Sequence, residues 1–361
     1  MTKRQRYLEA MQLRPTDQLV WAPNFDYWYQ INSKQKTLPK QYVGMSRNDI
    51  VRQIDAYLWA RAPGLRSVLD SSIKTSSFVE KENTITEIHT PLGTVRQVHT
   101  KSESEFSTPV LTEHYVKDLE TLKIMKYIAE GRTYQANTQP VLDMLSAVGD
   151  DGIVLNGFAC VPFIQFAKTD AGYVNAFYLW MDHKEQVDSL IEVYFKQFLE
   201  GYALLAAGPA DVIATGDNMD GTMISPSIFE EYAMPFYQEV KKITSRQNKL
   251  LEAHWCGRTQ NLLKYVPESG IDIVEAVVTK PMADIELNQA LALLDGKAVL
   301  QGGIPAVYMC DSFSLDEFQS YIEKTILPLK SHKGFILGMS DNVPPDADFR
   351  RVEMVSGLIK S

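Results

Sequence analysis

The stretch LLEAHWCGRTQNLLKYV, residues 250–266, places a histidine and a cysteine two positions apart, directly before a glycine. The apolar residues before His254 indicate a buried strand that ends near this point. Because alternate residues of a strand point to the same face, the side chains of His254 and Cys256 are expected to lie together. Nitrogen and sulfur ligands suit Zn²⁺, which binds them at ~2.0–2.3 Å. The pair is therefore a candidate zinc site.

A third ligand for such a site is available on the next apolar run. Glu275 lies in IDIVEAVV, residues 271–278, and could supply a carboxylate oxygen. Three protein ligands suffice at a catalytic zinc, because one coordination position stays exchangeable. Two other interpretations remain open: Cys256 is a small core residue, or it is a nucleophile activated by His254. The second is less favoured, because neighbours on one strand hold each other poorly for proton transfer.

These residues belong to a repeating pattern in which a short apolar run precedes a helical segment. The runs occupy residues 152–159, 211–218, 249–257, 271–278, 297–305 and 334–342, after 18–24 and a strand expected near 65–74. Strands that alternate with helices indicate βαβ units and a parallel sheet. Eight runs predict an α/β fold, a single (β/α)8 TIM barrel over residues 1–361. The pattern alone is also compatible with an open sheet.

One segment departs from this pattern. Residues 76–108 alternate apolar and polar side chains on both sides of TPLGT, which is typical of a β-hairpin. We therefore predict a hairpin inserted at residues 76–105. It is either a solvated decoration or part of a lid or partner surface.

Catalytic groups of a parallel barrel lie at the carboxyl ends of its strands. Asp217 and Asn218 end the run 211–218, and we predict that they position the substrate or transfer a proton. Asp341 ends the last run and is a further candidate for the same cavity.

Composition excludes several classes of function. The formal net charge of −9 disfavours nucleic-acid binding, which needs clustered Lys and Arg. No apolar run approaches the ~18 residues of a membrane span, so no membrane association is expected. Three cysteines do not make a disulfide framework, and a reducing, cytoplasmic setting is expected.

Two segments resemble the uroporphyrinogen decarboxylase superfamily: residues 254–305, HWCGRTQNLLKYV through LQGGIP, and residues 216–243, GDNMDGTMISPSIFEEYAMPFYQEVKKI. The His-x-Cys-Gly version resembles that of the zinc-containing, corrinoid-dependent methyltransferases. The resemblance implies a (β/α)8 barrel, Zn²⁺ on His254 and Cys256, and a methylated corrinoid supplied by a partner protein. It also implies a cysteine near the last strand, where this chain has Met339. Glu275 or Asp341 would then replace that thiol, and Cys310 is expected to pack in the core.

The resemblance to the decarboxylases themselves is weaker. Those enzymes have an arginine-rich N-terminal stretch that binds the carboxylates of a porphyrinogen, whereas VWAPNFDYWYQIN, residues 20–32, has no arginine. We expect Asn24, Asp26 and Tyr27 to contact a less charged substrate, unless the aromatic residues only fill the barrel.

Three functions follow from these observations. The first is a zinc-dependent methyltransferase between a small thiol or methoxy compound and a corrinoid protein. The alternatives are a decarboxylase-like lyase without metal and a non-catalytic barrel that binds a corrinoid protein.

Overall fold

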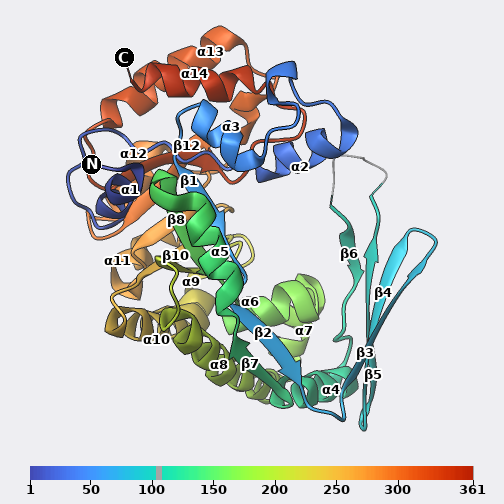
Figure 1. Ribbon diagram of the computed structural model, residues 1–361. Coiled ribbons are helices and arrows are strands. Elements are labelled where there is room, and N and C mark those ends of the chain that lie inside the picture. The colour runs from blue at the N-terminus through green and yellow to red at the C-terminus, as the bar shows by residue number, and fades with distance from the viewer. Residues whose placement is uncertain (103–107, 361) are drawn as a thin grey trace.

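The computed structural model describes residues 1–102 and 108–360 (Figure 1). Within these residues the core is a parallel sheet of seven strands, each hydrogen-bonded to the next. In spatial order they are β1 (Leu58–Arg61), β8 (Gly152–Gly157), β9 (Val212–Thr215), β10 (Leu250–His254), β11 (Ile273–Val277), β12 (Val299–Pro305) and β13 (Phe335–Ser340). Most of their residues are buried, as expected for parallel strands covered on both faces.

Residues 20–22 close this sheet into a barrel. Trp21 forms a parallel bridge with Leu337 of β13, where the Leu337 N–H donates to the Val20 carbonyl at 2.9 Å. On the other side, the Tyr57 N–H donates to the Trp21 carbonyl at 2.8 Å, next to β1. The segment thus takes the eighth strand position, and the predicted (β/α)8 barrel is confirmed.

Helices surround the barrel and follow the strands along the chain (Figure 1). The α-helices are α1 (Lys3–Met11), α2 (Asp26–Gln35), α3 (Arg47–Gln53), α4 (Leu119–Glu130), α5 (Thr138–Val148), α6 (Pro162–Ile164), α7 (Tyr173–Asp182), α8 (Lys184–Ala206), α9 (Pro226–Ile228), α10 (Met234–Arg246), α11 (Val266–Ser269), α12 (Leu287–Leu293), α13 (Leu315–Tyr321) and α14 (Arg350–Leu358). The π-helices of the described residues are η3 (Gln165–Asp170), η4 (Phe229–Ala233) and η7 (Ile322–Ile326), and the 3₁₀ turns are η1 (Lys40–Tyr42), η2 (Gly149–Asp151), η5 (Leu263–Tyr265), η6 (Ala306–Met309) and η8 (Leu327–Leu329).

Local sequence explains where several of these helices begin. Ser225 caps α9 by accepting from the Ile228 N–H at 3.3 Å, and Pro226 takes the first helical position. Ser314 and Glu317 form a reciprocal capping box at the start of α13.

The hydrophobic core has two parts. Inward-facing residues of the strands, among them Trp59, Leu155 and Ala214, fill the barrel interior. A larger cluster lies between the strands and the helices. The interior is thus packed rather than hollow, and open space is confined to the ends of the barrel.

The segment after β1 leaves the barrel and forms two smaller sheets. Within the described residues, β3 (Lys74–Glu80), β4 (Asn83–Thr90), β5 (Gly93–Thr100) and β6 (Val110–Glu113) make an antiparallel sheet that stands beside the barrel (Figure 1). The hairpin expected at 76–105 corresponds to β4 and β5, flanked by β3 and β6; residues 103–105 lie outside the described residues.

The strand expected near residues 65–74 is placed differently. β2 (Leu65–Leu69) pairs with β7 (Arg132–Ala136) in an antiparallel ribbon outside the barrel, and β1 occupies the barrel position instead. Assignment of 65–74 to the barrel was therefore wrong. β2 is only half buried, which a strand inside a (β/α)8 barrel would not be.

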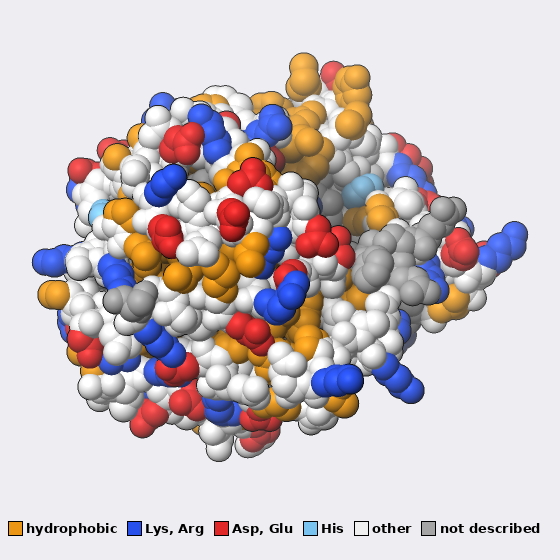
Figure 2. All heavy atoms as spheres, turned by 90° about the horizontal axis from the view of Figure 1, so that it is seen from above, with side chains coloured by type: hydrophobic (Ala, Val, Ile, Leu, Met, Phe, Trp, Pro, Cys, Tyr) orange, Lys and Arg blue, Asp and Glu red, His pale blue; other side chains and the backbone are white. Residues whose placement is uncertain are grey.

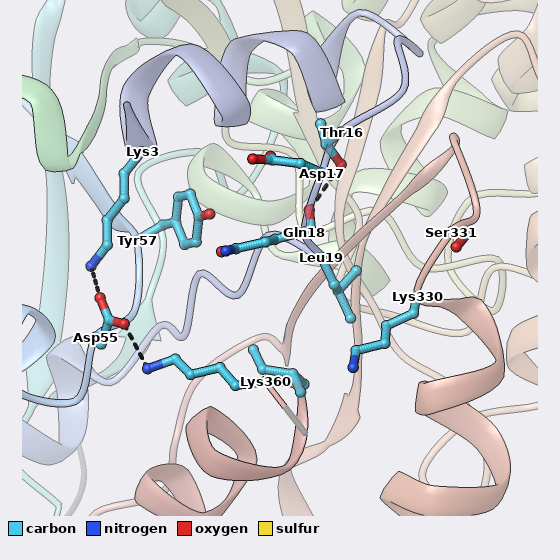
Figure 3. A pocket seen from close by; sticks show the side chains of 11 residues that line it. Lys3, Thr16, Asp17, Gln18, Leu19, Asp55, Tyr57, Lys330, Ser331 and Lys360 are labelled. Carbon is cyan, nitrogen blue, oxygen red and sulfur yellow. Dashed lines mark hydrogen bonds and ion pairs between the residues drawn. The ribbon is translucent and has the colours of Figure 1, made fainter. Parts of the chain in front are cut away.

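Charged side chains connect both ends of the described chain at the amino-terminal end of the barrel. Asp55 lies 2.5 Å from Lys3 of α1 and 2.6 Å from Lys360, which follows α14 (Figure 3). These residues line a cavity of about 340 Å³ together with Tyr57 and Lys330. This is the face of a (β/α)8 barrel opposite to that of catalysis, where side chains usually serve stability.

Surface charge is mixed on the face seen from above. Acidic and basic side chains are interspersed there (Figure 2), so the net charge of −9 is not gathered on this face. Among the described helices, none combines the length and the apolar character needed to cross a membrane.

Candidate functional site

His254 and Glu275 meet at the carboxyl end of the barrel. They are paired in register on β10 and β11, and His254 Nδ1 lies 2.5 Å from Glu275 Oε2. The pairing of β11 with β12 shifts after Glu275, at Ala276, whose φ is +65°. Such a bulge re-aims the neighbouring side chain, and Glu275 is buried against the imidazole with only 3% of its side chain exposed.

Cys256 follows β10 and lies at the same end of the barrel as His254. The intervening Trp255 is fully buried, and its backbone N–H donates to the backbone carbonyl of Glu275 at 2.9 Å. Cys256 is partly exposed and lines a cavity of about 400 Å³ at the barrel mouth. Burial lowers the pKa of His254, but the charge of Glu275 and hydrogen bonds with Cys256 and Glu275 raise it well above its ordinary value. The imidazole therefore contacts both partners.

The expected metal ligands form a chain of contacts rather than a cluster of three. Over residues 1–102 and 108–360, no three His, Cys, Asp or Glu side chains are arranged to hold a metal ion. The donor types at His254 and Cys256 are nevertheless those that Zn²⁺ prefers. Nδ1 of the imidazole is hydrogen-bonded to Glu275, so Nε2 is the nitrogen that is available to a metal.

The cavity beside Cys256 brings residues from several loops together. Its polar lining includes Tyr27, Asp220, Cys256, Arg258 and Asp341, and its apolar lining includes Val278, Met282, Ala306 and Pro344. Asp341 has a φ of +84° at the end of β13, a strained backbone of the kind that collects at functional sites.

The other two sulfur-containing residues considered for the metal site do not line the cavity beside Cys256. Met339 is buried, with 2% exposure. Cys310 follows η6 and is partly exposed, so the expectation that it packs in the core was wrong.

Asp217 and Asn218 are adjacent in sequence but differ in environment. Asp217 is fully buried and accepts hydrogen bonds from Thr215 Oγ1 at 2.5 Å, Tyr237 OH at 2.7 Å and the Val161 N–H at 2.8 Å. Burial raises the pKa of Asp217, and these donors oppose the rise. Asn218 is exposed and has a φ of +51°. Of the two, only Asn218 is accessible to a ligand.

The three residues expected to contact the substrate lie in different environments. Tyr27 lines the mouth cavity. Asn24 is buried and accepts from the Asp26 N–H at 3.4 Å, while Asp26 pairs with Arg47 at 2.6 Å. Tyr27 is thus the one of the three placed to contact a substrate there.

An arginine and a glutamate that were not predicted from the sequence also lie near the histidine. Arg61 Nη2 lies 3.8 Å from Glu275 Oε2, and its guanidinium stacks over Trp59 at 4.5 Å from the ring centroid. Glu252 is fully buried; burial and the charge of Glu275 raise its pKa to about 8, while Arg61 lowers it. Both residues could have been found from alternation along the strands, because residues two positions apart face the same side. Arg61 lies two positions after Trp59, and Glu252 lies two positions before His254.

Comparisons with known proteins agree with this architecture. The family model described as uroporphyrinogen decarboxylase (URO-D) matches residues 85–361. A solved methyltransferase from Methanosarcina mazei has a TM-score of 0.60 and 11% identity, covering 100% of this chain and 98% of that one. At this identity the likeness shows the fold. A putative vitamin-B12 independent methionine synthase from Listeria monocytogenes has a TM-score of 0.35 and 13% identity, covering 62% of this chain and 70% of that one. No curated protein matches the sequence.

Proposed function

The chain belongs to the uroporphyrinogen decarboxylase family, and from this premise we propose that it transfers a methyl group between a small substrate and a corrinoid carried by a partner protein. The observation that carries the proposal is the pair of His254 and Cys256 at the barrel mouth, with the imidazole held by Glu275 at 2.5 Å. An imidazole and a thiol at the catalytic end of a barrel suit Zn²⁺.

In this proposal His254 and Cys256 hold the metal, and Glu275 keeps a proton on Nδ1 of the imidazole. A carboxylate that accepts from the second ring nitrogen fixes the tautomer and orientation of a metal-binding histidine. Asp341 lines the same cavity as Cys256 and is the other carboxylate considered for the place of the missing thiol, but among the described residues it does not form one group of ligands with His254 and Cys256. When bound, zinc supplies Lewis acidity that lowers the pKa of a substrate thiol or polarises the oxygen of a methoxy group.

The remaining residues of the mouth serve the substrate. Tyr27 and Arg258 line the cavity, and Asn218 stands exposed at the end of β9. The partner presents its corrinoid at this mouth. Because the three cysteines are free in the described structure, we also propose a reducing, cytoplasmic setting.

A lyase without metal is the second candidate. Residues 20–32 contain no arginine, but Arg61 and Arg258 place guanidinium groups at the barrel mouth. Guanidinium groups bind carboxylates, which a decarboxylase-like substrate must carry.

Zinc stoichiometry and corrinoid-dependent methyl transfer, measured on the same preparations, test the proposal. We expect about one zinc per chain in the wild type, and loss of both zinc and activity in Cys256→Ser and His254→Ala. Cys310→Ser is the matched control, because its thiol lies outside the cavity lining and should leave both unchanged. Full methyl transfer by metal-free protein, or by either site variant, would contradict the proposal.

A further inference from the structure

Arg61 completes an inward-facing row on β1. Tyr57 and Trp59 precede it by four and two positions and are buried in the barrel interior. The Arg61 side chain continues this row, yet 51% of it is exposed. A half-exposed side chain at the carboxyl end of an inward row faces the barrel mouth.

The guanidinium of Arg61 lies close to the candidate zinc-binding histidine. Arg61 Nη2 is 3.8 Å, and His254 Nδ1 2.5 Å, from the same oxygen of Glu275. The distance between the two nitrogen atoms therefore cannot exceed the sum of these contacts. A small molecule can reach both groups at once.

The strands between β1 and β10 carry no side chain at the barrel mouth. β8 and β9 lie between β1 and β10 in the sheet, and their inward rows lead to Gly157 and Gly216. Both glycines are exposed, and a Cβ atom added to either would meet nothing within 4 Å. By contrast, a Cβ on Gly152, at the start of β8, would lie 1.8 Å from the Leu58 carbonyl oxygen. Glycine at the mouth thus leaves room for a ligand.

The donors of Arg61 are largely unused. Its contact with Glu275 is longer than a hydrogen bond, and its guanidinium makes no hydrogen bond with the other described residues. If the only role of Arg61 were to neutralise Glu275 and Glu252, close contact with these carboxylates would be expected. A guanidinium has five N–H donors in a planar fork that matches a carboxylate.

We infer that Arg61 selects the substrate by binding a carboxylate in the space above Gly157 and Gly216. The short span from Arg61 to His254 limits the ligand to a small organic acid whose reacting sulfur or oxygen is a few bonds from the carboxylate. This inference rests on the proposed function, since it takes the chemistry at His254 and Cys256 as given. It adds that the substrate carries a negative charge and that Arg61 is the residue that recognises this charge.

Calorimetric titration with 3-mercaptopropionate and its uncharged amide tests the inference without turnover. We expect the wild type to bind the acid about 10–100-fold more tightly, as for a charge-assisted hydrogen bond. Arg61→Gln should abolish this preference, and Arg61→Lys should retain part of it. Arg66→Gln, which removes an exposed arginine from β2, is the matched control and should leave the preference intact. Inorganic phosphate should compete weakly if the site is shaped for a carboxylate.

Gly157→Val gives a test that leaves Arg61 and its neighbours unchanged. The added side chain should fill the open space and weaken binding of the acid at least tenfold, while thermal unfolding shows that the fold persists. Equal affinity of the wild type for acid and amide, or a preference that survives in Arg61→Gln, would overturn the inference. If the preference is found but no methyl transfer occurs with any substrate, the proposed function fails and the role of Arg61 stands. If methyl transfer is as fast with neutral substrates as with acids, the proposed function stands and the role of Arg61 in selecting the substrate fails.

Discussion

His254 Nδ1 and Glu275 Oε2 face each other at 2.5 Å across paired positions of β10 and β11. The contact fixes which imidazole nitrogen remains available to a ligand. It also places the carboxylate behind the histidine, where it orients the ring. We therefore favour Glu275 as the partner of the histidine over its expected role as a third zinc ligand.

Replacement of Glu275 separates these two roles. If Glu275 orients the imidazole, Glu275→Gln should weaken zinc binding ~10–100-fold, the usual cost of losing such a partner. Cys256→Ser should weaken it more, because it removes a ligand. Competition with a chelator of known affinity measures both. An equal loss in the two variants would instead identify Glu275 as a ligand.

Asp217 and Asn218 should respond differently to substitution. Asp217→Ala leaves Thr215, Tyr237 and the Val161 N–H without their acceptor, so we expect a loss of about 3 kcal/mol or more in the free energy of unfolding. Asn218→Gly keeps the positive φ and should change stability by less than about 0.5 kcal/mol. We expect it to slow methyl transfer at least ~10-fold if the side chain positions substrate.

Urea unfolding and methyl transfer on both variants check this pair. A stable Asp217→Ala protein with no activity would reverse the assignment and give Asp217 the catalytic role.

Asp170 should make stability depend on pH. It is buried in η3, where it accepts from Gln165 Nε2 at 3.0 Å and Tyr194 OH at 2.7 Å. Burial raises its pKa from 3.8 to about 7, against the effect of these donors. Between these two values the folded state holds a proton that the unfolded state has lost. Stability should therefore fall as pH rises from about 4 to 7, by at most ~1.4 kcal/mol per unit from this group.

Asp170→Asn should remove that slope. We expect the variant to gain stability relative to the wild type between pH 5 and pH 8, measured by urea unfolding at each pH. Asp150→Asn, at an exposed position, is the control. Parallel pH profiles for the wild type and Asp170→Asn would show that Asp170 ionises normally.

The ion pairs of Asp55 should matter little to stability. Asp55 is half exposed, and such pairs are usually worth less than about 1 kcal/mol. The two lysines lower its pKa against the effect of burial. Asp55→Asn should therefore lower the melting temperature slightly at low salt and not at all at 1 M NaCl. A large, salt-independent loss would show that Asp55 has a packing role.

Much of the barrel could be predicted from the sequence, because β8 to β13 are apolar runs bounded by glycine or polar residues. β1 was missed because LWAR is short and carries an arginine, whereas β2 has strand character without belonging to the barrel. β4 and β5 were recognisable from the alternation around TPLGT. The exposed β3 carries little hydrophobic signal.

The site was predictable only in part. Spacing placed His254 and Cys256 at a strand end, and chain order suggested Glu275. The contact between His254 and Glu275 depends on the register of β10 and β11, which sequence alone does not determine. Asp217 follows the end of β9, where alternation no longer applies, so its burial against Tyr237 could not be foreseen. Arg61 was missed together with the strand that carries it.

Closure of the barrel through Trp21 and Leu337 has a consequence for folding. The two residues are more than 300 positions apart, so the last pairing joins an early segment to a late strand. During synthesis, residues 20–22 can contact the start of β1 early, but their other edge stays unpaired until β13 has been made. Such non-local pairing slows folding and leaves strand edges open to aggregation. Ribosome-bound chains that stop before residue 335 should therefore be much more sensitive to protease than the full-length chain.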